Sequence, residues 1–300
     1  GDVFCACNVL TNEDFAVKLS PANNTASVLH REYEILCKLQ GIVSLPHIIS
    51  CGNEGGYSAM ILECLGPSLD ELFDSCCQSF SNYMIAMIGR QLLQQLENIH
   101  LCNFIHRDIK PSNIIISTSQ NTSIVYLIDF SIAKQYRDPY THLHNSFGKC
   151  GGFLSSYAFT SINSQLGFEP GRRDDIESLA YLLTYFSCGS LPWLGHPSFD
   201  SEALVNMKKD ISQCDDIPQA LMTMLSYSQS LSFTQKPDYP YLQTLVASIC
   251  TNSPLLDSWL EWERTGGMTS TTVKNLSPLG CKMDEIAVRR RPAKKRCRYL

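Results

Sequence analysis

The sequence predicts a two-lobed α+β fold, in which a small β-rich N-terminal lobe is joined to a larger helical C-terminal lobe. Residues 1–62 contain mostly short β-type segments, and Gly66-Pro67 then breaks the chain. From Ser68 onward, apolar residues recur mainly at helical spacing. The 300 residues are enough to bury a sizeable core. We expect an N-lobe over 1–62, a hinge over 63–67, a C-lobe over 68–264 and a flexible tail over 265–300, where apolar periodicity is lost.

The N-terminal lobe combines strands with one helix. Residues 15–19 form a short apolar strand that contains a single lysine, Lys18. Two further strands are predicted over 48–51 and 57–63, with a turn at Gly55-Gly56. A helix is predicted over residues 26–40, because its apolar side chains fall within about 120° of arc. That buried stripe consists of Val28, Leu29, Ile35, Leu36 and Leu39.

The C-terminal lobe is predicted from two long apolar stripes. The first runs through Met84, Ile88, Leu92, Leu96 and Ile99, and the second through Ile176, Leu179, Leu183 and Phe186. Both stripes have the spacing of helices that bury one face. Short β-type segments at 114–116 and 125–128 lie between them.

The composition indicates an intracellular globular protein. No stretch is both long and apolar enough to span a bilayer, and residues 1–10 lack the basic and apolar regions of a secretory signal. The 14 cysteines are scattered, without zinc-site spacing, so we expect reduced thiols in the cytoplasm or nucleus. We expect a monomer with neither a membrane partner nor a specific nucleic-acid partner.

Charge is distributed unevenly along the chain. Seven of the 24 basic residues lie between Arg289 and the end, which leaves 17 basic against 29 acidic residues in the rest. A basic run of this kind is typical of a segment that binds a nuclear-import receptor or a polyanion. The alternative interpretation is a solvated, disordered end.

The centre of the predicted chemistry is a loop that contains Asp108 and Asn113, followed by Asp129 after a short strand. Phosphoryl transfer requires an oriented hydroxyl, a group that accepts its proton, and cations on the phosphates. An aspartate accepts a proton, whereas Asn and Asp oxygens suit Mg²⁺. The order His106-Arg107-Asp108, then Asn113, then Asp129-Phe130 resembles the catalytic signature of protein kinases. Lys110, two residues after Asp108, matches the serine/threonine class.

Lys18 and Glu32 form a second predicted constellation. Lys18 stands in an apolar strand, where an unpaired charge is costly to bury. Glu32 falls at about 40° on the helical wheel, in the middle of the apolar stripe. A carboxylate that faces the core favours a cation, and Lys18 is the candidate. In the kinase fold such a lysine holds the α- and β-phosphates, and the glutamate holds the lysine.

Several longer stretches are similar to one group, the casein kinase 1 family of serine/threonine protein kinases. They are Leu65-Gly66-Pro67-Ser68-Leu69, the segment from Ile128 to Asp138, Ser161-Ile162-Asn163 in place of the usual Ala-Pro-Glu, residues 171–179, residues 189–193 and residues 236–239. The resemblance runs from Gly1 to about Glu263. It implies a kinase domain over 1–264 that phosphorylates protein substrates with ATP and Mg²⁺.

The resemblance also implies residue roles. Asp108 would be the catalytic base, Lys110 a phosphate contact and Lys18 the phosphate lysine that Glu32 holds. Asn113 and Asp129 would bind Mg²⁺. The adenine pocket would consist of Ala16, Leu62, Leu65, Ile115 and Ile128, with hinge backbone groups from Glu63 and Leu65. Asp175 would brace the catalytic loop. Arg172 and Arg173 would either be structural or help to bind an anionic substrate.

Three features depart from the family pattern. Gly1-Asp2-Val3-Phe4 matches only the end of the glycine-rich phosphate loop, so we expect that the preceding strand is missing from this sequence. Ser131 replaces the glycine of Asp-Phe-Gly, and we expect stiffer switching rather than lost chemistry. Ala158 replaces an arginine of the family's pocket for phosphorylated substrates. These departures leave an alternative open, a weakly active or inactive scaffold of the same fold.

Overall fold

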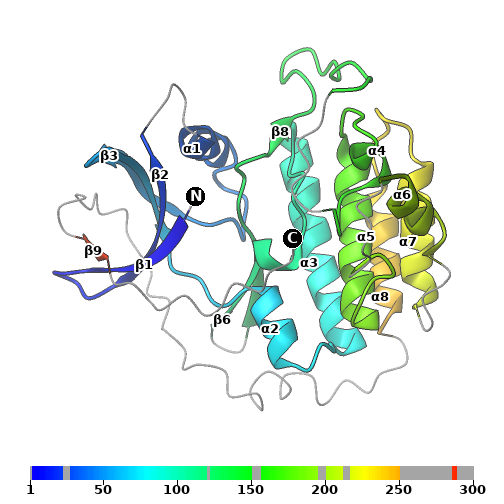
Figure 1. The fold of residues 1–300 in the computed structure, drawn as a ribbon, viewed down its shortest axis with the longest axis horizontal. Coiled ribbons are helices and arrows are strands. Elements are labelled where there is room, and N and C mark those ends of the chain that lie inside the picture. Colours follow the sequence, from blue (N-terminus) through cyan, green and yellow to red (C-terminus); the bar gives the residue numbers. More distant parts are fainter. Residues whose placement is uncertain are drawn as a thin grey trace.

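The structure is a computed structural model. It describes residues 2–22, 28–119, 122–150, 157–194, 201–211, 217–250 and 286–288. Figure 1 shows two lobes, with the larger group of strands and one helix on one side, and the remaining helices with a few short strands on the other. The predicted two-lobed α+β fold is therefore confirmed.

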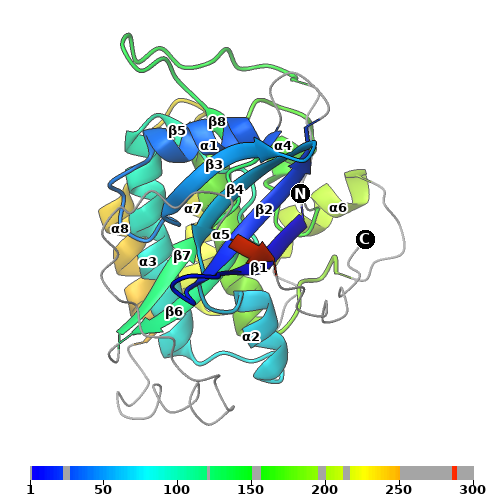
Figure 2. The ribbon, with the colours of Figure 1, turned by 90° about the vertical axis from the view of Figure 1, so that its left-hand side faces the viewer.

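A five-stranded antiparallel sheet forms the N-lobe. Its order is β3-β4-β2-β1-β9, as the view along the sheet in Figure 2 shows. The strands are β1 (Asp2–Asn8), β2 (Asp14–Pro21), β3 (Ile48–Glu54), β4 (Tyr57–Glu63) and β9 (Ile286–Val288). Strands β2 and β4 carry most of the N-lobe residues predicted for the site. The two strands are paired, with Ala16 opposite Leu62 and Lys18 opposite Met60.

Helix α1 (Val28–Lys38) packs against β2, β3 and β4. Its buried residues are Leu29, Glu32, Ile35 and Leu36, so the predicted stripe is correct over most of its length. Val28 is the exception, because it is 61% exposed at the first residue of the helix. Its inclusion in the buried stripe was wrong, since the core begins at the next residue, Leu29.

The C-lobe is built around two long helices, α3 (Asn82–Leu101) and α5 (Arg172–Cys188), which carry the two predicted stripes. Both belong to one large apolar core. The shorter helices are α2 (Leu69–Ser75), α4 (Ile162–Gln165), α6 (Ser201–Lys209), α7 (Gln219–Ser230) and α8 (Tyr239–Ser248). Two small sheets pair β5 (Phe104–Ile105) with β8 (Lys134–Gln135), and β6 (Ile114–Ser119) with β7 (Thr122–Leu127).

The hinge between the lobes is fixed by tight packing and by a helix cap. Ser68 accepts a hydrogen bond from the N–H of Glu71, whose carboxylate accepts one from the N–H of Ser68. This capping box starts α2 immediately after the hinge. A Cβ atom on Gly66 would lie 2.1 Å from Ile116 O, so the hinge runs directly against β6. These contacts hold the hinge against the C-lobe.

Most of the predicted tail lies outside the described residues, as does the basic run from Arg289. The boundary at residue 264 therefore stays a prediction. Residues 286–288 are the described part of this region, and they form β9 on the outer edge of β1. Among the residues that the structure describes, no helix has the length and apolar character needed to cross a membrane, and the cysteines are free thiols.

Candidate active site

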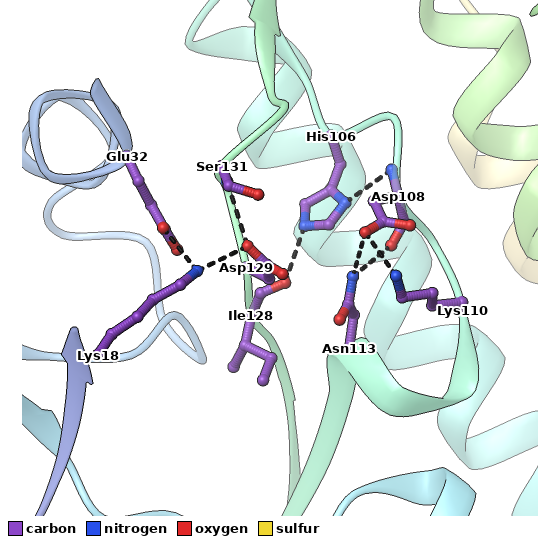
Figure 3. Close-up of polar contacts among 9 residues, drawn as sticks. All are labelled: Lys18, Glu32, His106, Asp108, Lys110, Asn113, Ile128, Asp129 and Ser131. Carbon is purple, nitrogen blue, oxygen red and sulfur yellow. Dashed lines mark hydrogen bonds and ion pairs between the residues drawn. The ribbon is translucent and has the colours of Figure 1, made fainter. Parts of the chain in front are cut away.

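Asp108 lies on the loop between β5 and β6, and its carboxylate is buried among polar groups. Lys110 Nζ donates to Asp108 Oδ2 over 2.9 Å, and Asn113 Nδ2 donates to the same oxygen over 2.7 Å. Asn113 Nδ2 also contacts Asp108 O at 3.0 Å, as Figure 3 shows. The short helix η1 (Pro111–Asn113) turns the chain so that Asn113 reaches back to Asp108. Three residues predicted for the site are therefore in mutual contact.

The backbone of this loop is held in a strained conformation. Arg107 has a φ of 72°, which is uncommon for a residue with a side chain. Asp175 on α5 accepts the N–H of His106 through Oδ2 and the N–H of Arg107 through Oδ1, each at 2.8 Å. His100 Nε2 lies 2.9 Å from Asp175 Oδ2. Burial opposes the charge of Asp175, but the His100 hydrogen bond and the other contacts still lower its pKa. A buried carboxylate thus fixes the loop that carries Asp108.

His106 connects the two halves of the site. Its Nδ1 accepts the N–H of Asp108, and its Nε2 donates to Ile128 O at 3.1 Å. A ring with one acceptor and one donor nitrogen is neutral. The complete burial of the side chain lowers its pKa, in agreement with that state. Sequence reasoning gave His106 no role, although its place in the His-Arg-Asp motif was the available signal.

Lys18 lies between two carboxylates. Its Nζ is 2.7 Å from Glu32 Oε2 and 2.8 Å from Asp129 Oδ1. Burial opposes the charge of Lys18, but the charges of Glu32 and Asp129 outweigh it and raise the pKa of the amine. For Glu32 burial dominates, and its pKa is raised despite the ion pair. Three elements, β2, α1 and the segment after β7, therefore meet at one ammonium group.

Asp129 has the ionised state that a cation site needs. Burial opposes ionisation, but the charge and hydrogen bond of Lys18, followed by a hydrogen bond from the Ser131 side chain, lower its pKa to about 2. Asp129 also has a left-handed φ of 65°. The next residue, Phe130, is fully buried and packs edge-on against His106, with ring centroids 4.7 Å apart. The strain at Asp129 is thus held by packing on one side and an ion pair on the other.

Ser131 fits its position without backbone strain. It is absent from the positive-φ positions of the described chain, so a Cβ atom is tolerated there. Its N–H lies 3.4 Å from Asp129 Oδ1. The substitution therefore leaves the placement of Asp129 intact. Stiffer switching at this position stays a prediction.

The predicted adenine pocket lies where the two lobes face each other. Ala16 and Leu62 are cross-strand neighbours, Ile115 lies on β6 opposite Tyr126, and Ile128 follows β7. These side chains and that of Leu65 are partly exposed. The N–H of Glu63 donates to His47 O at 3.1 Å, so the carbonyl is the backbone group that Glu63 offers. Ala16 and Leu62 are thus neighbours on the N-lobe sheet, and the pocket as a whole stays a prediction.

The side-chain oxygens of Asp129 and Asn113 suit a hard cation that is also bound by phosphate groups. Lys18 and Ser131 both contact Asp129 Oδ1, which leaves Oδ2 for a metal. The Asn113 amide nitrogen is occupied by Asp108, which leaves its carbonyl oxygen. No group of three or more His, Cys, Asp or Glu side chains that could hold a metal is found in the described part of the chain. Such a pair of oxygens matches Mg²⁺, which is usually bound by one or two protein ligands together with phosphate and water.

Arg172 and Arg173 were predicted either to be structural or to help bind an anionic substrate. Arg172 donates to Thr234 O and Arg173 to Leu231 O, both at 2.6 Å, and both side chains are buried. These contacts favour the structural role over the anion-binding one.

The chain was also compared with models of known protein families. It matches the protein kinase domain over residues 1–254. The match covers both lobes and every residue discussed above for the site.

Proposed function

This chain belongs to the protein kinase domain family, which transfers phosphate from ATP to proteins, and we propose that it is a serine/threonine kinase of the casein kinase 1 type. The observation that carries the proposal is the contact of Lys110 Nζ with Asp108 Oδ2 at 2.9 Å. It places a cation beside the carboxylate that would receive the proton of an incoming hydroxyl. A lysine at this position is typical of kinases that phosphorylate serine and threonine.

In the proposed reaction, the hydroxyl oxygen of a Ser or Thr side chain bonds to the γ-phosphorus of ATP. The bond from this phosphorus to the β,γ-bridging oxygen breaks, and its electron pair leaves with ADP. Asp108 orients the hydroxyl and accepts its proton. Lys110 is placed to neutralise charge on the transferred group. Most of the catalysis then comes from positioning and electrostatics.

The N-lobe residues are proposed to hold the nucleotide. Lys18 would contact the α- and β-phosphates, with Glu32 keeping its side chain in place. Ala16, Leu62, Leu65, Ile115 and Ile128 would enclose the adenine, and backbone groups of Glu63 and Leu65 would hydrogen-bond it. Asn113 and Asp129 would hold Mg²⁺, which when bound neutralises charge on the phosphates.

The test is transfer of radiolabelled γ-phosphate from ATP to casein, followed by identification of the phosphorylated amino acid. We expect phosphoserine and phosphothreonine, and a loss of at least about 100-fold in Asp108→Asn and in Asp129→Asn. Activity no higher than in these variants would favour the scaffold alternative. Phosphotyrosine as the main product would contradict the assigned class while leaving the kinase activity intact.

A further inference from the structure

Lys208 on α6 is a buried lysine that contacts none of the catalytic residues. Its side chain is 0% exposed. Its Nζ donates to Tyr157 O at 2.7 Å, to Thr160 O at 2.6 Å and to Gln165 Oε1 at 2.8 Å. An ammonium group has three N–H donors, and these three acceptors use all of them. These acceptors can satisfy the protonated side chain, which is costly to bury unless it is fully hydrogen-bonded, and burial lowers the pKa of the amine to about 7.

Two aromatic rings and a hydrogen bond from Trp193 complete this anchor. Lys208 Nζ lies 5.4 Å from the ring centroid of Tyr181 and 5.5 Å from that of Trp193. Trp193 Nε1 donates to Ala158 O at 2.7 Å. The backbone carbonyl groups of residues 157, 158 and 160 thus each accept a hydrogen bond from Lys208 or Trp193. We refer to residues 157–160 as the anchored segment.

The anchored segment lies beside the loop that carries Asp108. Thr160 and Ser161 line a small cavity together with Arg107, the residue before Asp108. The end of the segment is fixed as well, because Ser161 Oγ donates to Asp174 Oδ1 at 2.6 Å and the N–H of Ile162 donates to Glu177 Oε1 at 3.0 Å. A protein chain that brings a hydroxyl to Asp108 would therefore pass this segment.

The ATP side of the site is separate from this anchor. Lys18 lies on β2 in the N-lobe, whereas Figure 1 shows α6 with α4 and α5 in the C-lobe. In the described part of the chain, the hydrogen bonds of Lys208 go to the anchored segment and to α4. Its effect should therefore reach the protein substrate rather than the nucleotide.

We propose that Lys208 is a positioning residue for the protein substrate, acting by fixing the backbone of the anchored segment before the substrate arrives. The proposal rests on the kinase function proposed above. If the anchored segment is already ordered in the free protein, substrate binding does not include the entropy cost of ordering it. Loss of the anchor should weaken ground-state and transition-state binding of the protein alike, which raises KM and leaves kcat nearly unchanged.

The test compares Lys208→Met with Lys209→Met. Both substitutions remove one lysine from α6, but Lys209 is exposed. For Lys208→Met we expect the KM for casein to rise about 5- to 20-fold, with the KM for ATP within about twofold of wild type. Hydrogen–deuterium exchange in residues 157–162 should become faster in this variant and stay at the wild-type rate in Lys209→Met. Lys208→Gln keeps two N–H donors, and it provides the same comparison if Lys208→Met does not fold.

The outcomes separate this inference from the proposed function. Wild-type protein that transfers no phosphate would contradict the function, and the exchange experiment would still decide whether Lys208 orders the segment. An active folded variant with an unchanged KM for casein would overturn the positioning role. Equal increases in the KM values for casein and ATP would overturn it too, because they would show a general distortion of the domain.

Discussion

Arg107 adopts a left-handed backbone conformation, and its N–H donates a hydrogen bond of 2.8 Å to Asp175 Oδ1. The second oxygen of Asp175 binds the N–H of His106 and the ring of His100. Asp175 thus stabilises from α5 a conformation that costs about 1–3 kcal/mol at a residue with a side chain. The direction of the Asp108 side chain depends on this support.

Asp175→Asn should therefore lower kcat without affecting ATP affinity. The amide keeps one acceptor oxygen and places an NH₂ group against a donor. A displacement of the loop by about 1 Å would cost about 100-fold in kcat, and the unsatisfied donor about 1–3 kcal/mol of stability. Steady-state kinetics and urea unfolding measure the two effects. A kcat within threefold of wild type in the folded variant would contradict the proposed bracing role.

Gly66→Ala should raise the KM for ATP. The added Cβ would lie 2.1 Å from Ile116 O, so the hinge or β6 must shift. Because the hinge backbone is proposed to bind adenine, a shift of this kind should weaken ATP by about 10-fold or more. Gly148→Ala is the matched control, since nothing lies within 4 Å of its added Cβ. An equal KM for ATP in the two variants would show that the hinge backbone is not part of the nucleotide site.

The ion pair of Asp129 predicts a pH-dependent contribution to stability. Its pKa falls from 3.8 to about 2 in the folded protein, mainly because Lys18 outweighs burial. A lowered pKa means that the folded state favours the ionised form, so the contribution is present above pH 3.8 and is lost as the pH falls through 2. The side chain is 31% exposed, so we expect about 1–2 kcal/mol rather than the full shift.

Urea unfolding of wild type and Asp129→Asn between pH 2 and pH 6 measures this contribution. The difference between the two free energies of unfolding should be largest above pH 4 and should shrink toward pH 2. A constant difference over this range would contradict the low pKa, because the wild-type carboxylate would then keep one state throughout.

The sequence was informative where a charged residue occupied an apolar pattern. Lys18 interrupts a strand and Glu32 interrupts a helical stripe, so the cost of burial together with the catalytic-loop motif predicted that they would meet. Val28 fitted the same stripe but is exposed, because periodicity does not show where the core ends at a helix terminus. Lys208 was not predicted, although it lies four and three residues after the buried Leu204 and Val205, at the spacing of one helix face. Its burial depends on backbone carbonyls of a distant segment, which no side-chain pattern encodes.

Glu177 on α5 predicts a pH effect of the opposite sign. Burial raises its pKa from 4.5 to about 7, against the N–H of Ile162, the hydroxyl of Tyr181 and the charge of Lys208. A raised pKa means that the folded state retains the proton. The resulting stabilisation is complete below pH 4.5 and is lost as the pH rises to about 7. Its full size is about 3–3.5 kcal/mol, because the shift is about 2.5 pKa units and one unit corresponds to about 1.4 kcal/mol.

Glu177→Gln should remove this pH dependence. The amide oxygen can still accept the N–H of Ile162 and the hydroxyl of Tyr181, as Glu177 Oε1 does at 3.0 and 2.8 Å. As the pH rises from 5 to 8, wild type should therefore lose about 2–3 kcal/mol of stability that the variant keeps. Glu54→Gln, at an exposed position on β3, is the control and should show no such change. Urea unfolding at the two pH values measures the difference. Parallel curves for wild type and Glu177→Gln would mean that Glu177 is ionised in the folded protein at pH 5, contrary to the effect expected from its burial.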